Sequence, residues 1–78
     1  MSTSTEYNLV YRIVKEKKVY NKYFDNEADA LYFFNNDLKE LAKTTTIRNI
    51  ALTKFVYDND SGKAIIDQME RILDLVTL

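Results

Sequence analysis

The sequence contains no His, Cys, Trp or Pro and only one glycine, Gly62. Without His or Cys the chain cannot form the common structural zinc sites, a thiolate nucleophile or a Ser-His-Asp triad. A single glycine also excludes a phosphate-binding loop built from several glycines. The composition therefore favours binding over catalysis, and we predict neither enzymatic activity nor a cofactor.

The length of 78 residues predicts one domain, near the lower limit for a chain that folds without a disulfide or a metal. The core must come from apolar burial, for which 46% hydrophobic and 13% aromatic residues are available. Each buried aromatic side chain removes roughly 150–250 Å² from water. We expect a single α+β domain over residues 7–78, preceded by a flexible polar tail over residues 1–6.

Charge is divided along the chain, although the formal net charge is only −1. The segment 7–24 holds one acid, Glu16, and five basic residues: Arg12, Lys15, Lys17, Lys18 and Lys22. Acidic residues prevail after Phe24, so the molecule as a whole has no bulk attraction for nucleic acid or for an anionic membrane. No apolar run approaches the roughly 18–20 residues of a membrane span, and no signal peptide is recognisable, which predicts a cytosolic protein.

The first half of the sequence predicts a hairpin followed by a helix. Residues 7–15 alternate between two faces and residues 19–24 resume the alternation, as two antiparallel strands do. Asp25 is a good N-cap for a helix over residues 26–43, with acids in its first turn. The expected buried stripe of this helix consists of Ala28, Leu31, Phe34, Leu38 and Leu41.

The second half admits two readings after a long strand over residues 47–57 and a turn over residues 58–62. The favoured one has a short strand over residues 63–66 and a helix over residues 67–76, which gives the order β-β-α-β-β-α. The alternative starts the helix near Gly62 and gives β-β-α-β-α. Both predict a small antiparallel sheet with helices on one face.

Two clusters of acidic residues have structural explanations. A calcium loop that starts at Asp58 needs glycine sixth and glutamate twelfth, whereas Gly62 is fifth and Met69 is twelfth. We therefore predict a turn with Gly62 at positive φ. Asp67, Glu70 and Asp74 lie at helical spacing on an expected solvated face. We predict no metal site and no catalytic residue.

The basic hairpin is the strongest candidate for a contact surface, because tyrosines alternate there with lysines. Tyr32 and Phe33 fall beside the buried stripe of the helix and extend this surface if one of them is exposed. The predicted partner-binding residues are Tyr11, Lys15, Lys17, Lys18, Tyr20, Lys22, Tyr23, Tyr32 and Phe33. Bases stack on aromatic rings while phosphates meet lysines, so a small RNA- or ssDNA-binding domain is the alternative function. A half-buried hairpin with protective edge lysines would show the same pattern.

The segment Val19 to Phe34, a strand that runs into a capped helix with aromatic residues on its inner face, resembles a segment of many small phage proteins. The turn from Val56 to Lys63 is similar in style. The abundant Lys, Asn, Ile and Tyr also match the AT-rich codons of a low-GC bacterium or its phages. The resemblance implies a non-enzymatic inhibitor or modulator that occupies a surface of a host protein, as anti-CRISPR and other anti-defence proteins do. A self-assembling homodimer is a third class of function.

Overall fold

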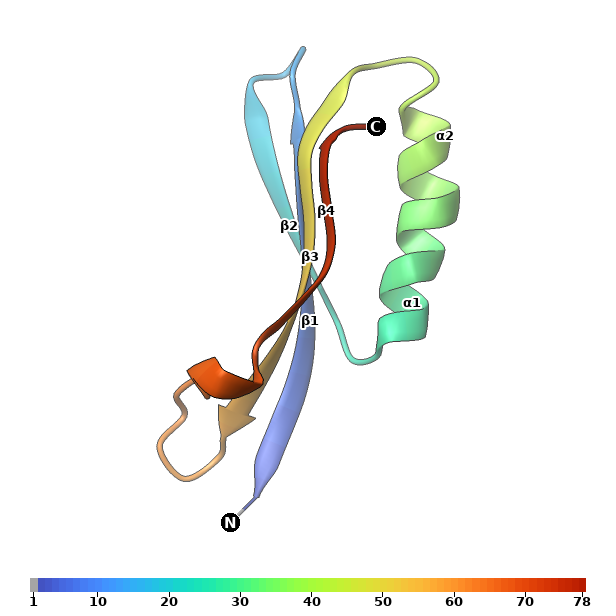
Figure 1. The fold of residues 1–78 in the computed structure, drawn as a ribbon. Coiled ribbons are helices and arrows are strands. Elements are labelled where there is room, and N and C mark those ends of the chain that lie inside the picture. Colours follow the sequence, from blue (N-terminus) through green and yellow to red (C-terminus); the bar gives the residue numbers. More distant parts are fainter. Residues whose placement is uncertain (1) are drawn as a thin grey trace.

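A four-stranded antiparallel sheet carries one helix on one of its faces in the computed structural model, which describes residues 2–78 (Figure 1). The strands are β1 (Thr3–Ile13), β2 (Lys18–Phe24), β3 (Ile47–Asp58) and β4 (Glu70–Thr77), in the spatial order β2-β1-β3-β4. The predicted α+β class and the antiparallel sheet are confirmed. The predicted order of elements is not, because the chain reads β-β-α-β-β.

The first hairpin forms as its alternation predicts. Leu9 on β1 is opposite Leu52 on β3, and Leu52 is opposite Leu73 on β4, so one leucine row crosses three strands on the face that the helix covers. β1 begins earlier than expected, since Thr3 pairs with Asp58. Residues 3–6, predicted to belong to a flexible tail, are therefore strand residues.

The helix is continuous but changes its winding. It consists of α1 (Glu27–Tyr32), a π-helical segment (Phe33–Leu38) and α2 (Lys39–Leu41). Its N-cap is Asn26 rather than the predicted Asp25, because the Asn26 side chain accepts a hydrogen bond of 2.8 Å from the backbone N–H of Asp29.

The buried face of the helix follows from this winding. Ala30, Phe34 and Leu38 are buried and recur every four residues. That spacing exceeds the 3.6 residues of an α-turn, and the wider π-turn keeps all three on one face. Of the other predicted stripe residues, Ala28 is exposed, Leu31 is half-buried and Leu41 is 38% exposed.

The predicted helix over residues 67–76 is wrong, because most of this segment is β4. The spacing of its apolar residues suits a helix, but Leu73, Asp74 and Leu75 also alternate as a strand does. Pairing with β3 satisfies backbone groups that β3 would otherwise expose and extends the leucine row. The predicted strand over residues 63–66 is reduced to one bridge between Ala64 and Tyr57, followed by a 3-10 turn at Ile66–Gln68.

The turn after β3 has the predicted conformation. Gly62 has a φ of 72°, in the left-handed region, and its N–H donates a hydrogen bond of 2.7 Å to the carbonyl of Asp58. The Asp58 carboxylate accepts a hydrogen bond of 3.0 Å from the N–H of Asp60. This carboxylate therefore stabilises the turn itself.

The core lies between the helix and one face of the sheet. Its buried residues are Leu9, Tyr11, Ile13, Ala30, Phe34, Leu38, Ile47, Ile50 and Leu52. Within residues 2–78 no α-helix covers the opposite face of the sheet, where only the short 3-10 turn at Ile66–Gln68 lies near the lower end, and this end of the sheet extends beyond α1 and α2 (Figure 1). None of the helices among residues 2–78 has the length and apolarity needed to cross a membrane.

Candidate functional site

Four aromatic side chains form a connected row near the β2 edge, on the helix-bearing face. We call Tyr11, Tyr20, Phe24 and Phe33 the aromatic strip. Tyr11 and Tyr20 are directly opposite in the β1–β2 register, and their rings stack at 5.3 Å with an interplanar angle of 11°. Phe33 comes from the helix and lies 6.2 Å from Tyr11 and 5.8 Å from Phe24, in tilted arrangements. Such geometries are favourable for aromatic pairs.

Two lysines of β2 cover this strip. The Nζ of Lys18 lies 5.0 Å from the centre of the Tyr20 ring, and the Nζ of Lys22 lies 4.6 Å from that of Phe33. In the register with β1, both lysines lie on the helix-bearing face, opposite Ile13 and Leu9. Neither has an ion-pair partner among residues 2–78. The strip is therefore a row of rings capped by two exposed ammonium groups that are free to bind a carboxylate or a phosphate.

Glu16 closes one end of the row. Its carboxylate accepts a hydrogen bond from the Tyr20 hydroxyl, and this bond is the main cause that raises the pKa of Tyr20 above its usual 10.0. The pKa of Tyr11 is raised first by burial and then by the charge of Glu16. Both phenols remain protonated at neutral pH and carry no charge, and the Tyr20 hydroxyl donates its hydrogen bond to Glu16.

The structure brings together five of the nine predicted residues: Tyr11, Lys18, Tyr20, Lys22 and Phe33. Tyr11 is only 5% exposed, so it supports Tyr20 and offers little surface of its own.

The other four predicted residues lie outside the strip. Tyr23 is 63% exposed but pairs with Asn8 on the opposite face of the sheet. Tyr32 is 67% exposed on the helix. Lys15 and Lys17 lie in the β1–β2 turn, where Lys17 has a positive φ of 56°.

The sequence interpretation missed Phe24 and Glu16. Phe24 alternates in phase with Tyr20 and Lys22, so strand periodicity alone could have assigned it to the same face. Glu16 is the single acid of the basic segment, and no local pattern shows that its carboxylate meets Tyr20.

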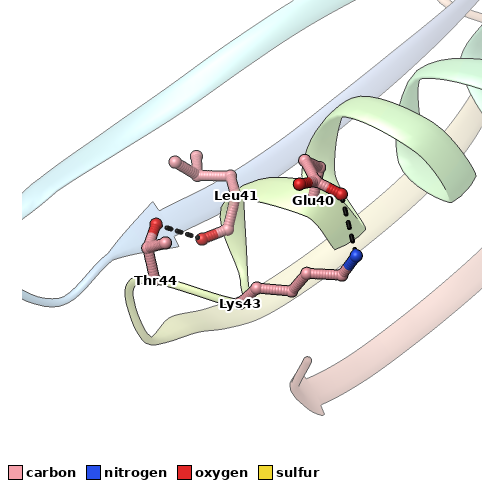
Figure 2. Close-up of polar contacts among 4 residues, drawn as sticks. All are labelled: Glu40, Leu41, Lys43 and Thr44. Atoms are coloured by element: carbon pink, nitrogen blue, oxygen red, sulfur yellow. Dashed lines mark hydrogen bonds and ion pairs between the residues drawn. The ribbon is translucent and has the colours of Figure 1, made fainter.

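The end of the helix next to the β1–β2 turn is held by local contacts (Figure 2). Lys43 pairs with Glu40 at 2.9 Å, and the Thr44 hydroxyl donates a hydrogen bond of 3.1 Å to the carbonyl of Leu41. A shallow hollow of about 440 Å³ lies between this end and the turn, lined by Ile13, Lys15, Glu16, Leu41, Thr44 and Thr45. Residues 2–78 hold no group of three His, Cys, Asp or Glu side chains that could bind a metal ion.

Comparison with protein-family models, with curated proteins and with solved structures finds no match to this chain.

Proposed function

We propose that this chain is a non-enzymatic protein-binding module whose contact surface is the aromatic strip with Lys18 and Lys22. The observation that carries the proposal is the row of aromatic rings under two unpaired ammonium groups at an edge of the sheet. Aromatic and cationic side chains are favoured anchors of protein interfaces. The proposed partner surface is acidic, because it must neutralise these lysines.

We extend this proposal to an inhibitor or modulator that occupies a surface of a host protein in the cytosol, in the manner of small phage and anti-defence proteins. Two features of the sequence support it: the chain lacks the residues of common catalytic sites, and its layout resembles such proteins. A stoichiometric blocker needs a stable surface and no reacting group.

The alternative, binding of RNA or single-stranded DNA, has the same lysines in its favour. Base stacking, however, requires free ring faces. Tyr20 already stacks on Tyr11 and has the Lys18 ammonium over its ring, while Phe33 has the ammonium of Lys22 over its own. The most exposed sheet tyrosine, Tyr23, lies on the other face. The geometry therefore favours a protein partner.

Affinity capture from a lysate of a low-GC bacterium tests the proposal. We expect the unmodified protein and the control variant Lys63→Glu to recover the same host protein, and Lys22→Glu to lose it. The two variants change the charge equally, but Lys63 lies at the far turn. Equal recovery by all three proteins would contradict the proposed surface.

A gel shift at low salt tests the nucleic-acid alternative. Binding that falls steeply with salt, and that is lost when Lys17, Lys18 and Lys22 are replaced, would establish the alternative and reject the proposed function.

A further inference from the structure

Among residues 2–78, no second strand pairs with β2, which is therefore an edge of the sheet. It pairs with β1 over all seven of its residues, without a register shift, and five of the seven are exposed. The outer side of such a strand presents unpaired N–H and C=O groups, which can template a further strand.

The usual protections of an edge strand are weak in β2. The chain has no proline, and the β1–β2 ladder has no bulge. Its two lysines could shield the edge, but both ammonium groups lie over rings of the helix-bearing face. The other edge, β4, is different, because its ladder with β3 contains a register shift between Leu52 and Thr53.

The side chains of β2 define what a fifth strand would meet. On the helix-bearing face the strand presents Lys18, Tyr20, Lys22 and Phe24. On the other face it presents Val19, which is 56% exposed, and Tyr23, which is 63% exposed. A matching strand therefore carries acids opposite the lysines, four residues apart, and apolar residues on its other face.

We propose that the β2 edge accepts an extended acidic segment of a partner protein as a fifth, antiparallel strand. This inference rests on the proposed function and names how the partner binds. Backbone hydrogen bonds would supply affinity, while the lysines and the exposed Val19 and Tyr23 would set the register.

A second copy of this chain fits the edge less well. β2 contains no acid, so two antiparallel β2 strands would gather four lysines on one face without a counter-charge. On β4, Glu70 and Asp74 are four residues apart, as are the two lysines of β2, but the register shift places these two acids on opposite faces of the sheet. Glu70 is opposite Lys54 on the helix-bearing face, whereas Asp74 is opposite Ala51 on the other.

Synthetic peptides test the inference on the unmodified protein. The acidic probe is Val-Val-Glu-Thr-Val-Val-Glu, whose two glutamates would lie opposite Lys22 and Lys18 in an antiparallel strand. Its partner probe has lysine at both glutamate positions. Fluorescence anisotropy gives the affinities, and we expect the lysine probe to bind at least about fivefold more weakly, since two exposed ion pairs are exchanged for repulsions.

Backbone methylation distinguishes strand addition from side-chain binding alone. Two further acidic probes carry N-methyl groups on alternate residues, in opposite phase. Since successive N–H groups of a strand point to opposite sides, we expect one phase to abolish binding and the other to retain it. In the complex, amide exchange should slow at β2 and stay unchanged at β4.

Four results would overturn the inference: no binding of the acidic probe, equal binding of the acidic and lysine probes, equal binding of both methylated probes, or a dimeric mass in light scattering with slow exchange at β2. The last would assign the edge to a second copy. The proposed function is tested separately, because capture that depends on Lys22 would stand even if both methylated probes bound alike.

Discussion

The contact between Lys22 and Phe33 allows a quantitative test of the aromatic strip. The ammonium of Lys22 lies 4.6 Å from the Phe33 ring centre, and a partly exposed pair of this kind contributes about 0.5–1 kcal/mol. Phe33 also makes two aromatic contacts, with Tyr11 and Phe24, each worth about 0.5–1.5 kcal/mol. Phe33→Leu should therefore lower the free energy of unfolding by about 1.5–4 kcal/mol, and Lys22→Met by about 0.5–1 kcal/mol.

Only the double-mutant cycle isolates the contact. Lys22→Met keeps an apolar chain of similar length and removes the charge. Because Lys22→Met and Phe33→Leu each remove the same cation–π contact, the double variant should lose less stability than the sum of the two single losses. The expected coupling energy is about 0.5–1 kcal/mol. A chain of 78 residues has a total stability of roughly 4–12 kcal/mol, so the cycle requires a starting stability above the largest expected loss of about 4 kcal/mol. Urea unfolding followed by circular dichroism gives the four free energies of the cycle.

Lys18 supplies the matched control. Its ammonium lies over Tyr20 rather than Phe33, so Lys18→Met and Phe33→Leu should be nearly additive. A coupling below about 0.3 kcal/mol for the Lys22 cycle, or equal couplings for both lysines, would refute the assigned cation–π contact.

Three further predictions concern single positions. Asn8 is 9% exposed, and its side-chain nitrogen has no hydrogen-bond partner among residues 2–78. Asn8→Val should therefore raise the free energy of unfolding, measured in urea, by about 1–3 kcal/mol. A lower free energy of unfolding in the variant would contradict the unpaired amide. Gly62→Ala should cost about 1–2 kcal/mol in thermal unfolding, entirely from the φ of 72°, since an added Cβ meets no atom within 4 Å; an unchanged midpoint would reject this. The pKa of Tyr20 is raised in the folded state, so the contribution of this group to stability is complete below pH 10.0 and is lost as the pH rises through the folded-state pKa. Glu16→Gln removes the carboxylate that accepts the Tyr20 hydrogen bond and should move the ultraviolet titration of Tyr20 to lower pH. An unmoved titration would exclude this hydrogen bond as the cause of the raised pKa.

The first half of the fold was predictable because its signals are local. In β1 the apolar residues Leu9, Tyr11 and Ile13 alternate with residues that face away, and the structure buries all three. The helix start was displaced by one residue, from Asp25 to Asn26, because both are good N-caps and only Asn26 reaches the N–H of Asp29.

The fate of residues 67–76 was not predictable from periodicity. Met69, Ile72, Leu73 and Val76 fit a helix as well as Leu73 and Leu75 fit a strand. Residues 70–77 form a strand because they pair with the free edge of β3, where Leu73 lies opposite the buried Leu52. This pairing is a long-range contact, which no local sequence pattern predicts.

Strand periodicity predicted part of the candidate site. Lys18, Tyr20 and Lys22 share a strand face because they alternate, and the structure keeps them together. Tyr23 has the opposite phase, so strand periodicity alone separates it from them. That the Phe33 ring meets this row depends on how the helix packs on the sheet, which the sequence does not show.

The sheet order converts the charge division of the sequence into a spatial one. The two opposite edges of the sheet are β2, whose Lys18 and Lys22 give a formal charge of +2, and β4, whose Glu70, Asp74 and Arg71 give a formal charge of −1. A net charge of −1 gives little overall attraction for any partner, but edges of opposite sign orient an approaching charged surface. An acidic segment would be steered toward β2 and repelled from β4, and added salt should slow its association more than its dissociation. Because Glu70 and Asp74 lie on different faces, the same division does not make the edges of two copies complementary. The charge pattern thus favours a foreign acidic strand at β2 over head-to-tail assembly of the protein with itself.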